Sequence, residues 1–222
     1  MKKSIAIIGL SRFGLSLVEA FSTLDVDLVA IDVDEEAVKK AGELISNAFI
    51  GDSTDIDSLR AAGIANVDHA IVAIGQNEFE NLSTSIISVI KLKELGVKEI
   101  TARADDDDYG EVLTLVGANH IVHPLSIAAE RIANKLALGN VLDYFHVRQN
   151  YDIYEVKIAE SFKPLPLVEL NSRSRFHINI LLIERDKKIY VPTRDTVLQP
   201  GDEIFIFGRK QDITRVLGIF SQ

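Results

Sequence analysis

The chain has 222 residues, of which 47% are hydrophobic and 26% charged, a composition typical of a folded globular protein. It contains no cysteine, which excludes disulfides, thiolate metal sites and cysteine nucleophiles. The net charge is −9, and the first 140 residues hold 22 acidic but only 12 basic side chains. Because an acidic surface repels polyanions and no basic stripe offsets it, the charge argues against nucleic acid as a partner.

The opening Met-Lys-Lys precedes an apolar run that is too short for a signal peptide, and no small-residue cleavage site follows it. The longest stretch without Asp, Glu, Lys or Arg spans residues 112–129 and contains glycine, histidine and proline, which does not fit a membrane span. The sequence therefore predicts a soluble protein that reaches a membrane only through a partner.

Short runs rich in Ile and Val alternate with helix-length amphipathic runs in the first 140 residues, the pattern of βαβ units. The short runs are almost continuously apolar, as in strands that helices cover on both faces. We therefore predict an α/β fold with a Rossmann-like, doubly wound parallel sheet whose ligand lies at the carboxyl ends of the strands. The predicted strands are residues 4–8, 28–31, 48–50, 69–74, 99–103 and 120–122, and the predicted helices are residues 15–22, 35–44, 56–62, 78–95, 106–116 and 126–138.

The pattern changes after residue 140, where four of the five prolines separate short strand-like runs. Asp186 and Lys187 stand between two of these runs and predict a tight hairpin. We predict two domains, a Rossmann-like domain over residues 1–140 and a small α+β domain over residues 141–222. The predicted strands of the second domain are residues 153–158, 178–184, 188–191 and 203–207.

Residues 6–14 carry the strongest functional signal, a predicted strand that leads through Gly9 and Gly14 into a helix, as in a G-x-G-x-x-G phosphate loop. In such a loop Gly9 would make the tight turn, and Gly14 would let helix and strand pack closely with a phosphate at the helix N-terminus. Asp32 ends the second predicted strand, where a carboxylate can bond both ribose hydroxyls. The alternative is a glycine turn without a ligand, but the register of strand, helix and Asp32 favours nucleotide binding.

Two residues inside the loop differ from a dinucleotide site. Ser11 stands at the middle glycine position, where its Cβ crowds a pyrophosphate but its hydroxyl can bond a phosphate oxygen. Arg12 offers a bidentate grip on a terminal phosphate, or is a solvated surface residue. Both interpretations of Arg12 stay open at this point.

Two further strand ends are predicted to border an adenosine pocket. The segment Gly51-Asp52-Ser53-Thr54-Asp55 follows the third predicted strand, and Ala73-Ile74-Gly75 ends the fourth. The alternative for the first of these segments is N-capping of the next helix, by Ser53 or Asp55.

The sequence shows no set of residues for catalysis. The acidic run at residues 105–108 fits the first turn of a helix, and the five histidines lack metal-ligand spacing. There is no G-x-S-x-G elbow and no P-loop lysine, and the last 80 or so residues offer no acid or base for hydride transfer. We predict a binding protein that is not an enzyme, with a small NAD(P)-dependent oxidoreductase as the alternative.

Six segments of the chain stand in an order and spacing known from one family. They are residues 8–14, 30–32, 51–54, 71–75, 117–124 and 140–144, with weaker signatures at residues 171–173 and 199–202. With these segments the whole chain resembles the RCK (KTN) regulatory subunits of bacterial potassium uptake systems, the KtrA/TrkA family, and in particular its single-RCK KtrA type.

In that family the front domain binds ATP or ADP, or in some members NAD(H), and dimers assemble into an octameric ring that gates a membrane potassium channel. The resemblance implies a cytoplasmic regulatory subunit, attached to the inner face of the cell membrane through a KtrB/TrkH-like channel subunit. The residues that it assigns to the nucleotide are Gly9, Ser11, Arg12, Phe13, Gly14, Asp32, Asp52, Ser53, Ala73, Gly75 and Arg103.

The resemblance also concerns the second domain and the helix that precedes it. Family members bind cyclic di-AMP between paired C-terminal domains, and the matching residues here are Arg173, Ile178 and Pro192. Leu125 stands where related chains carry a glutamate near a cation, so no metal is predicted. An apolar helical stripe, which fits a dimer contact or packing on the chain's own sheet, consists of Ala128, Ala129, Ile132, Ala133 and Leu136.

Overall fold

The computed structural model describes residues 2–75 and 79–221. These residues form two compact units, Met1–Ile127 and Ala128–Gln222. The division falls inside helix α6 (Pro124–Ala137), before the domain boundary at residue 140 that the sequence analysis predicts, and that functional boundary stays a prediction. Within the described ranges, no helix is both long enough and apolar enough to cross a bilayer.

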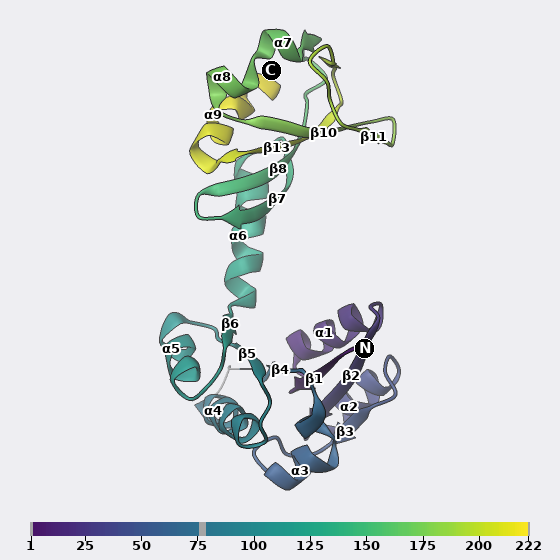
Figure 1. The fold of residues 1–222 in the computed structure, drawn as a ribbon, viewed down its shortest axis with the longest axis vertical. Helices are drawn as coiled ribbons and strands as arrows, with labels where there is room; N and C mark the ends of the chain where they lie inside the picture. The colour runs from purple at the N-terminus through teal and green to yellow at the C-terminus, as the bar shows by residue number, and fades with distance from the viewer. Residues whose placement is uncertain (1, 76–78, 222) are drawn as a thin grey trace. The chain divides into compact units, whose positions relative to one another are not determined.

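The first unit is built on one six-stranded parallel sheet, which confirms the predicted fold class (Figure 1). Its strand order is β3-β2-β1-β4-β5-β6, so the chain turns back at β1, and the two halves of the sheet meet between β1 and β4. Ligands of doubly wound sheets bind at this position, beyond the carboxyl ends of the strands. The strands are β1 (Lys3–Ile8), β2 (Val26–Asp32), β3 (Ala48–Ile50), β4 (His69–Val72), β5 (Glu99–Arg103) and β6 (His120–Val122).

The strands carry apolar side chains on both faces of the sheet, and helices cover both faces. In β1, Ile5 and Ile7 belong to a core that contains Val18 of α1 and Val38 of α2. On the other face of β1, Ile8 belongs to a second core that contains residues of α3, α4 and α5. The helices are α1 (Arg12–Ser22), α2 (Glu35–Gly42), α3 (Ile56–Ala61), α4 (Phe79–Glu94) and α5 (Asp107–Leu115), with a 3-10 turn at Ile64–Asn66.

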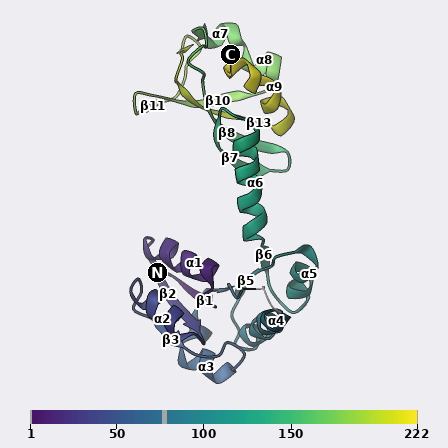
Figure 2. The same cartoon turned by 180° about the vertical axis from the view of Figure 1, so that it is seen from behind.

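The second unit is an α+β fold, as predicted, with an antiparallel sheet in the order β11-β10-β13-β8-β7. Helix α9 (Lys210–Phe220) lies against this sheet (Figure 2). Its residues Ile213, Val216 and Phe220 are buried in the core that they share with the strands. The strands are β7 (Val141–Arg148), β8 (Tyr151–Lys157), β10 (Asn179–Arg185), β11 (Lys188–Tyr190) and β13 (Glu203–Arg209), and the smaller elements are β9 (Leu165–Pro166), β12 (Val197–Leu198), α7 (Leu167–Leu170) and α8 (Ser172–Phe176).

The hairpin predicted at Asp186 and Lys187 is confirmed. Arg185 and Lys188 are cross-strand partners, and the two residues between them have φ angles of 52° and 61°. Positive φ at both central residues is the geometry of a type I′ turn, whose twist matches that of the flanking strands.

An ion pair with a buried carboxylate holds the segment at residues 199–202. The Asp202 carboxylate is 1% exposed and accepts hydrogen bonds from Arg185 Nε at 2.6 Å and Nη2 at 2.8 Å. The backbone N–H of Gln199 donates to the same carboxylate at 2.8 Å. These bonds fasten the turn before β13 to β10, and the hydrogen bond to Asp202 raises the pKa of Arg185.

Candidate nucleotide site

The turn between β1 and α1 needs glycine at two positions for steric reasons. Gly9 has a φ of +91°, and a Cβ placed on it would lie 2.7 Å from Ile74 Cγ1 and 2.9 Å from Ile74 N. A Cβ on Gly14 would lie 2.1 Å from the carbonyl oxygen of Gly9. Both glycines thus make the close contacts expected of a phosphate loop, while the placement of a phosphate there stays a prediction.

Ser11 fastens this turn to the neighbouring strand. Its hydroxyl donates to the carbonyl oxygen of Ala73 at 2.6 Å, and its oxygen accepts from Gly14 N at 3.4 Å. This capping bond explains why α1 begins at Arg12, three residues earlier than the sequence pattern predicts. The Ser11 hydroxyl therefore ties this turn to the residue that follows β4, and its contact with a phosphate stays a prediction.

The Asp32 carboxylate is hydrogen-bonded to the turn between β1 and α1. One oxygen accepts a hydrogen bond from the backbone N–H of Leu10, and the other accepts from Asp34 N at 2.9 Å. Because each carboxylate oxygen has two lone pairs, these bonds fix the group and leave acceptor capacity for ribose hydroxyls.

These groups border a cavity of about 480 Å³, within the usual size range of ligand pockets. Six of the predicted residues line it: Gly9, Ser11, Asp32, Asp52, Ser53 and Gly75. Five more lining residues lie in segments that the sequence analysis singled out: Leu10, Ile31, Gly51, Thr54 and Ile74. It did not single out the remaining four, which are Val33, Asp34, Ala37 and Thr84. Asp34 follows the predicted end of β2 by two residues and could have been found from that position, whereas Thr84 lies inside α4 and carries no local signal.

Asp52 and Ser53 sit in the loop after β3 in different surroundings. Asp52 Oδ1 accepts from the N–H and the hydroxyl of Thr54, at 2.8 and 2.7 Å. Ser53 is buried, and its hydroxyl pairs with that of Ser88 on α4 at 2.7 Å. Asp52 therefore presents a polar group to the cavity, while Ser53 mainly links the loop to α4.

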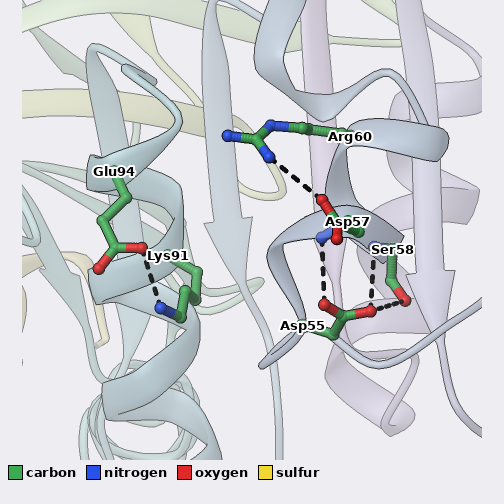
Figure 3. Close-up of polar contacts among 6 residues, drawn as sticks. All are labelled: Asp55, Asp57, Ser58, Arg60, Lys91 and Glu94. Carbon is green, nitrogen blue, oxygen red and sulfur yellow. Dashed lines mark hydrogen bonds and ion pairs between the residues drawn. The ribbon is translucent and has the colours of Figure 1, made fainter.

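The cap of α3 is Asp55, one of the two candidates from the sequence. Its carboxylate accepts from Asp57 N at 3.1 Å, from Ser58 N at 3.3 Å and from the Ser58 hydroxyl at 2.9 Å (Figure 3). These bonds lower the pKa of Asp55. Figure 3 also shows the pairs Arg60–Asp57 in α3 and Lys91–Glu94 in α4, each an i,i+3 contact within its own helix.

Five of the predicted nucleotide residues are not among those that line the cavity. Gly14 and Ala73 support its wall through the contacts already given, and Arg12 is the exposed first residue of α1. Arg103, at the end of β5, forms a bidentate pair with Asp105 at 2.9 and 3.1 Å. Its guanidinium lies 5.9 Å from the centre of the Phe13 ring. Direct contact of Arg12, Phe13 or Arg103 with a nucleotide stays a prediction.

Residues 106–108 of the acidic run form the N-cap and the first turn of α5, as predicted, whereas Asp105 precedes them and pairs with Arg103. Asp106 caps this helix by accepting from Tyr109 N at 2.9 Å, and Asp107 and Asp108 occupy its first turn. Across residues 2–75 and 79–221, no three His, Asp or Glu side chains are grouped to hold a metal ion.

The second unit contains a cavity of its own, of about 550 Å³. Arg173 and Pro192 line it, as does Arg194, which the sequence analysis did not single out. Ile178 does not line it, because its side chain is completely buried in the core of the unit. Ile180 takes part in the lining instead, next to residues from α7 and the turn before α8.

A doubly wound sheet with a glycine turn and an acidic residue at the end of β2 defines a nucleotide-binding class of α/β protein. Family models give that class a name: a TrkA-N domain matches residues 5–124, and a TrkA-C domain matches residues 153–221. The chain belongs to the family of Ktr and Trk potassium uptake proteins, which confirms the resemblance found in the sequence.

Two relatives from Bacillus subtilis cover nearly the whole chain. Ktr system potassium uptake protein C is 40% identical over 97% of this chain and 96% of its own, and Ktr system potassium uptake protein A is 31% identical over 96% and 95%. Among solved structures, a chain of the GsuK channel has a TM-score of 0.67 at 19% identity. That match covers all of this chain but 40% of the channel chain, and it supports the fold alone.

Proposed function

We propose that the chain is a cytoplasmic regulatory subunit of a potassium uptake system, which senses a nucleotide in the cavity of the first unit. The observation that carries this proposal is the meeting of the glycine turn and the Asp32 carboxylate at one cavity, in a chain of the Ktr and Trk family. The nucleotide is ATP or ADP, with NAD(H) as the alternative. The domains are residues 1–140 for the nucleotide and residues 141–222 for the TrkA-C part.

The cavity suits an adenine nucleotide in one orientation. The phosphates would lie at the N-terminus of α1, where free N–H groups and the helix dipole favour anions. The ribose would bond Asp32, and the adenosine would lie toward Asp52 and Gly75. Arg12, at the first position of α1, would reach the terminal phosphates, including those of a partner subunit.

Replacing Asp32 with alanine is expected to weaken ADP binding by about 1–3 kcal/mol, the range for hydrogen bonds to a charged group. Calorimetric titration of ADP measures this loss, and Asp25→Ala, which removes an exposed carboxylate at the other end of β2, serves as the control. Equal affinities for the Asp32 variant and the unmodified chain would remove Asp32 from the ribose site.

The names of the relatives support a regulatory role over an enzymatic one, because both are potassium uptake proteins. A small NAD(P)-dependent oxidoreductase remains the alternative, since an acid at the end of β2 also suits nicotinamide dinucleotides. Oxidation of NADH by the purified chain would favour that alternative.

We further propose that the subunit works as a homodimer within an octameric ring on a KtrB/TrkH-like channel subunit. The supporting observation is the apolar stripe of α6, where Ile132 and Leu136 are 59% and 78% exposed. A ligand shifts an equilibrium between two states only if it binds one state more tightly than the other. The coupling free energy is typically about 1–3 kcal/mol per site, and a ring of subunits adds up the contributions of its sites.

The cavity of the second unit supports cyclic di-AMP as a second ligand. Arg173 and Arg194 line it, and guanidinium groups can grip phosphates in a bidentate manner. Titration of cyclic di-AMP into the full chain should show saturable binding, which Arg173→Ala weakens by about 1–3 kcal/mol. Lack of binding at high micromolar ligand would contradict the assignment.

A further inference from the structure

One face of the five-stranded sheet of the second unit carries apolar side chains that lie outside the hydrophobic cores. The side chains of β8 and β13 alternate between the two faces of the sheet. On one face they are completely buried in the core that contains residues of α9, as Tyr154 and Ile206 show. The opposite face, which we call the outer face, carries residues that belong to none of the cores of the described chain: Phe145, Ile153, Leu182, Phe205 and Phe207.

Aromatic and aliphatic side chains form a continuous row across the outer face. Ile153 of β8 is the cross-strand partner of Phe145 on β7 and of Phe207 on β13. The Tyr151 ring stacks on that of Phe207, with 5.6 Å between the ring centres. Phe145 and Tyr151 are still 47% and 42% exposed. Because the open face of an antiparallel sheet is usually polar, this exposed row indicates an interaction surface.

Carboxylates lie next to the apolar row on the same face. Glu155 is the cross-strand partner of Asp143, and Glu184 is that of Glu203. Burial and repulsion by the neighbouring carboxylates raise the pKa of Glu155. Arg131 forms an ion pair with Asp143, but Glu155, Glu184 and Glu203 have no ion-pair partner among the described residues. Three carboxylates on this face are thus left for a partner to neutralise.

The basic residues of the outer face leave these carboxylates unpaired. Lys157 is the cross-strand partner of Glu203 but forms no ion pair within the described chain, and Arg209 pairs with Asp212. A second copy of the same face would bring carboxylates against carboxylates, which electrostatic complementarity disfavours. The first 140 residues, with 22 acidic and 12 basic side chains, carry the same sign of charge. The charges therefore favour a basic partner.

We propose that the outer face docks a basic segment of a partner protein. The apolar side chains of that segment pack on the row around Ile153, and its Lys or Arg side chains pair with Glu155, Glu184 and Glu203. Cytoplasmic segments of membrane proteins have this chemistry, because they carry an excess of Lys and Arg beside apolar spans. The inference goes beyond the proposed nucleotide site and does not require a nucleotide in the first unit.

The test uses a short fluorescein-labelled peptide of alternating Lys and Leu, titrated into the full chain and followed by fluorescence anisotropy. We expect saturable binding, which the double variant Phe145→Ser, Glu155→Gln weakens by about tenfold or more, since it removes one apolar contact and one ion pair. The matched control is Leu44→Ser, Glu43→Gln, because Leu44 is also 47% exposed and Glu43 is its exposed neighbour. The control should bind the peptide as the unmodified chain does, and a peptide of alternating Glu and Leu should not bind.

The double variant Glu155→Gln, Glu184→Gln leaves the apolar row intact and is expected to weaken binding as well, should the Phe145 variant fold poorly. Absence of saturable binding, an equal loss in the outer-face and control variants, or binding of the acidic peptide overturns the inference. A smaller assembly of the Phe145 variant in light scattering also overturns it, because that result identifies a second copy as the occupant. Titration of ADP into the same samples tests the nucleotide site separately, so the failure of one proposal is distinguishable from the failure of the other.

Discussion

Replacement of Gly14 by alanine is expected to lower the free energy of unfolding of the first unit by about 3 kcal/mol or more and to abolish ADP binding. The added Cβ would lie 2.1 Å from the carbonyl oxygen of Gly9, far inside van der Waals contact. The atom that it meets belongs to the backbone, so relief requires the turn and α1 to move apart. Overpacking typically costs 1–3 kcal/mol, and a clash with backbone lies at or above the upper end.

The matched control is Gly42→Ala, also a glycine-to-alanine change in a helix of the first unit. No atom lies within 4 Å of a Cβ placed on Gly42, so alanine should stabilise the helix by up to about 1 kcal/mol. Urea unfolding of both variants, combined with ADP titration, separates the two cases. A Gly14 variant that is as stable as the unmodified chain and binds ADP normally would contradict the close packing at this turn.

Ile132→Asp is expected to convert the proposed dimer into monomers. In a two-fold interface the same stripe meets its copy, so one substitution buries two unpaired carboxylates. An uncompensated buried charge costs about 3–5 kcal/mol, enough to shift association by two to three orders of magnitude or more. Light scattering at micromolar concentration measures the outcome directly.

Leu24→Asp is the control for this experiment. Leu24 lies in the turn after α1 and is 58% exposed, against 59% for Ile132, so the two substitutions change equally accessible apolar surface. Only the α6 variant should lose the dimer. Dissociation of both variants, or of neither, would show that the α6 stripe is not the dimer contact.

The fold of the first unit could be predicted because its signals are local. Strands buried on both faces read as continuous apolar runs, such as Ile5–Ile8, and each run stands before an amphipathic helix. In the second unit the sequence analysis missed β7 (Val141–Arg148), because Asp143, His146 and Arg148 interrupt its apolar residues. It also passed over α9, although Ile213, Val216, Leu217 and Phe220 recur at helical spacing.

The candidate site also combines residues that the sequence predicts with contacts that it does not. Gly9, Gly14 and Asp32 could be found because their spacing follows from the geometry of a strand, a turn and a helix. The contacts of Ser11 with the Ala73 carbonyl and of Arg103 with the Phe13 ring could not, since these groups come close only through tertiary packing. Ile178 shows the same limit, because its position in the core is set by strands distant in sequence.

Native mass spectrometry of the purified chain, with and without added ADP, tests the central proposal most directly. It reports the number of chains and the mass of any bound ligand in one spectrum. The proposal predicts an assembly with an even number of chains and one adenine nucleotide in each. A monomer that carries no nucleotide, even in the presence of excess ADP, ATP or NADH, would contradict it.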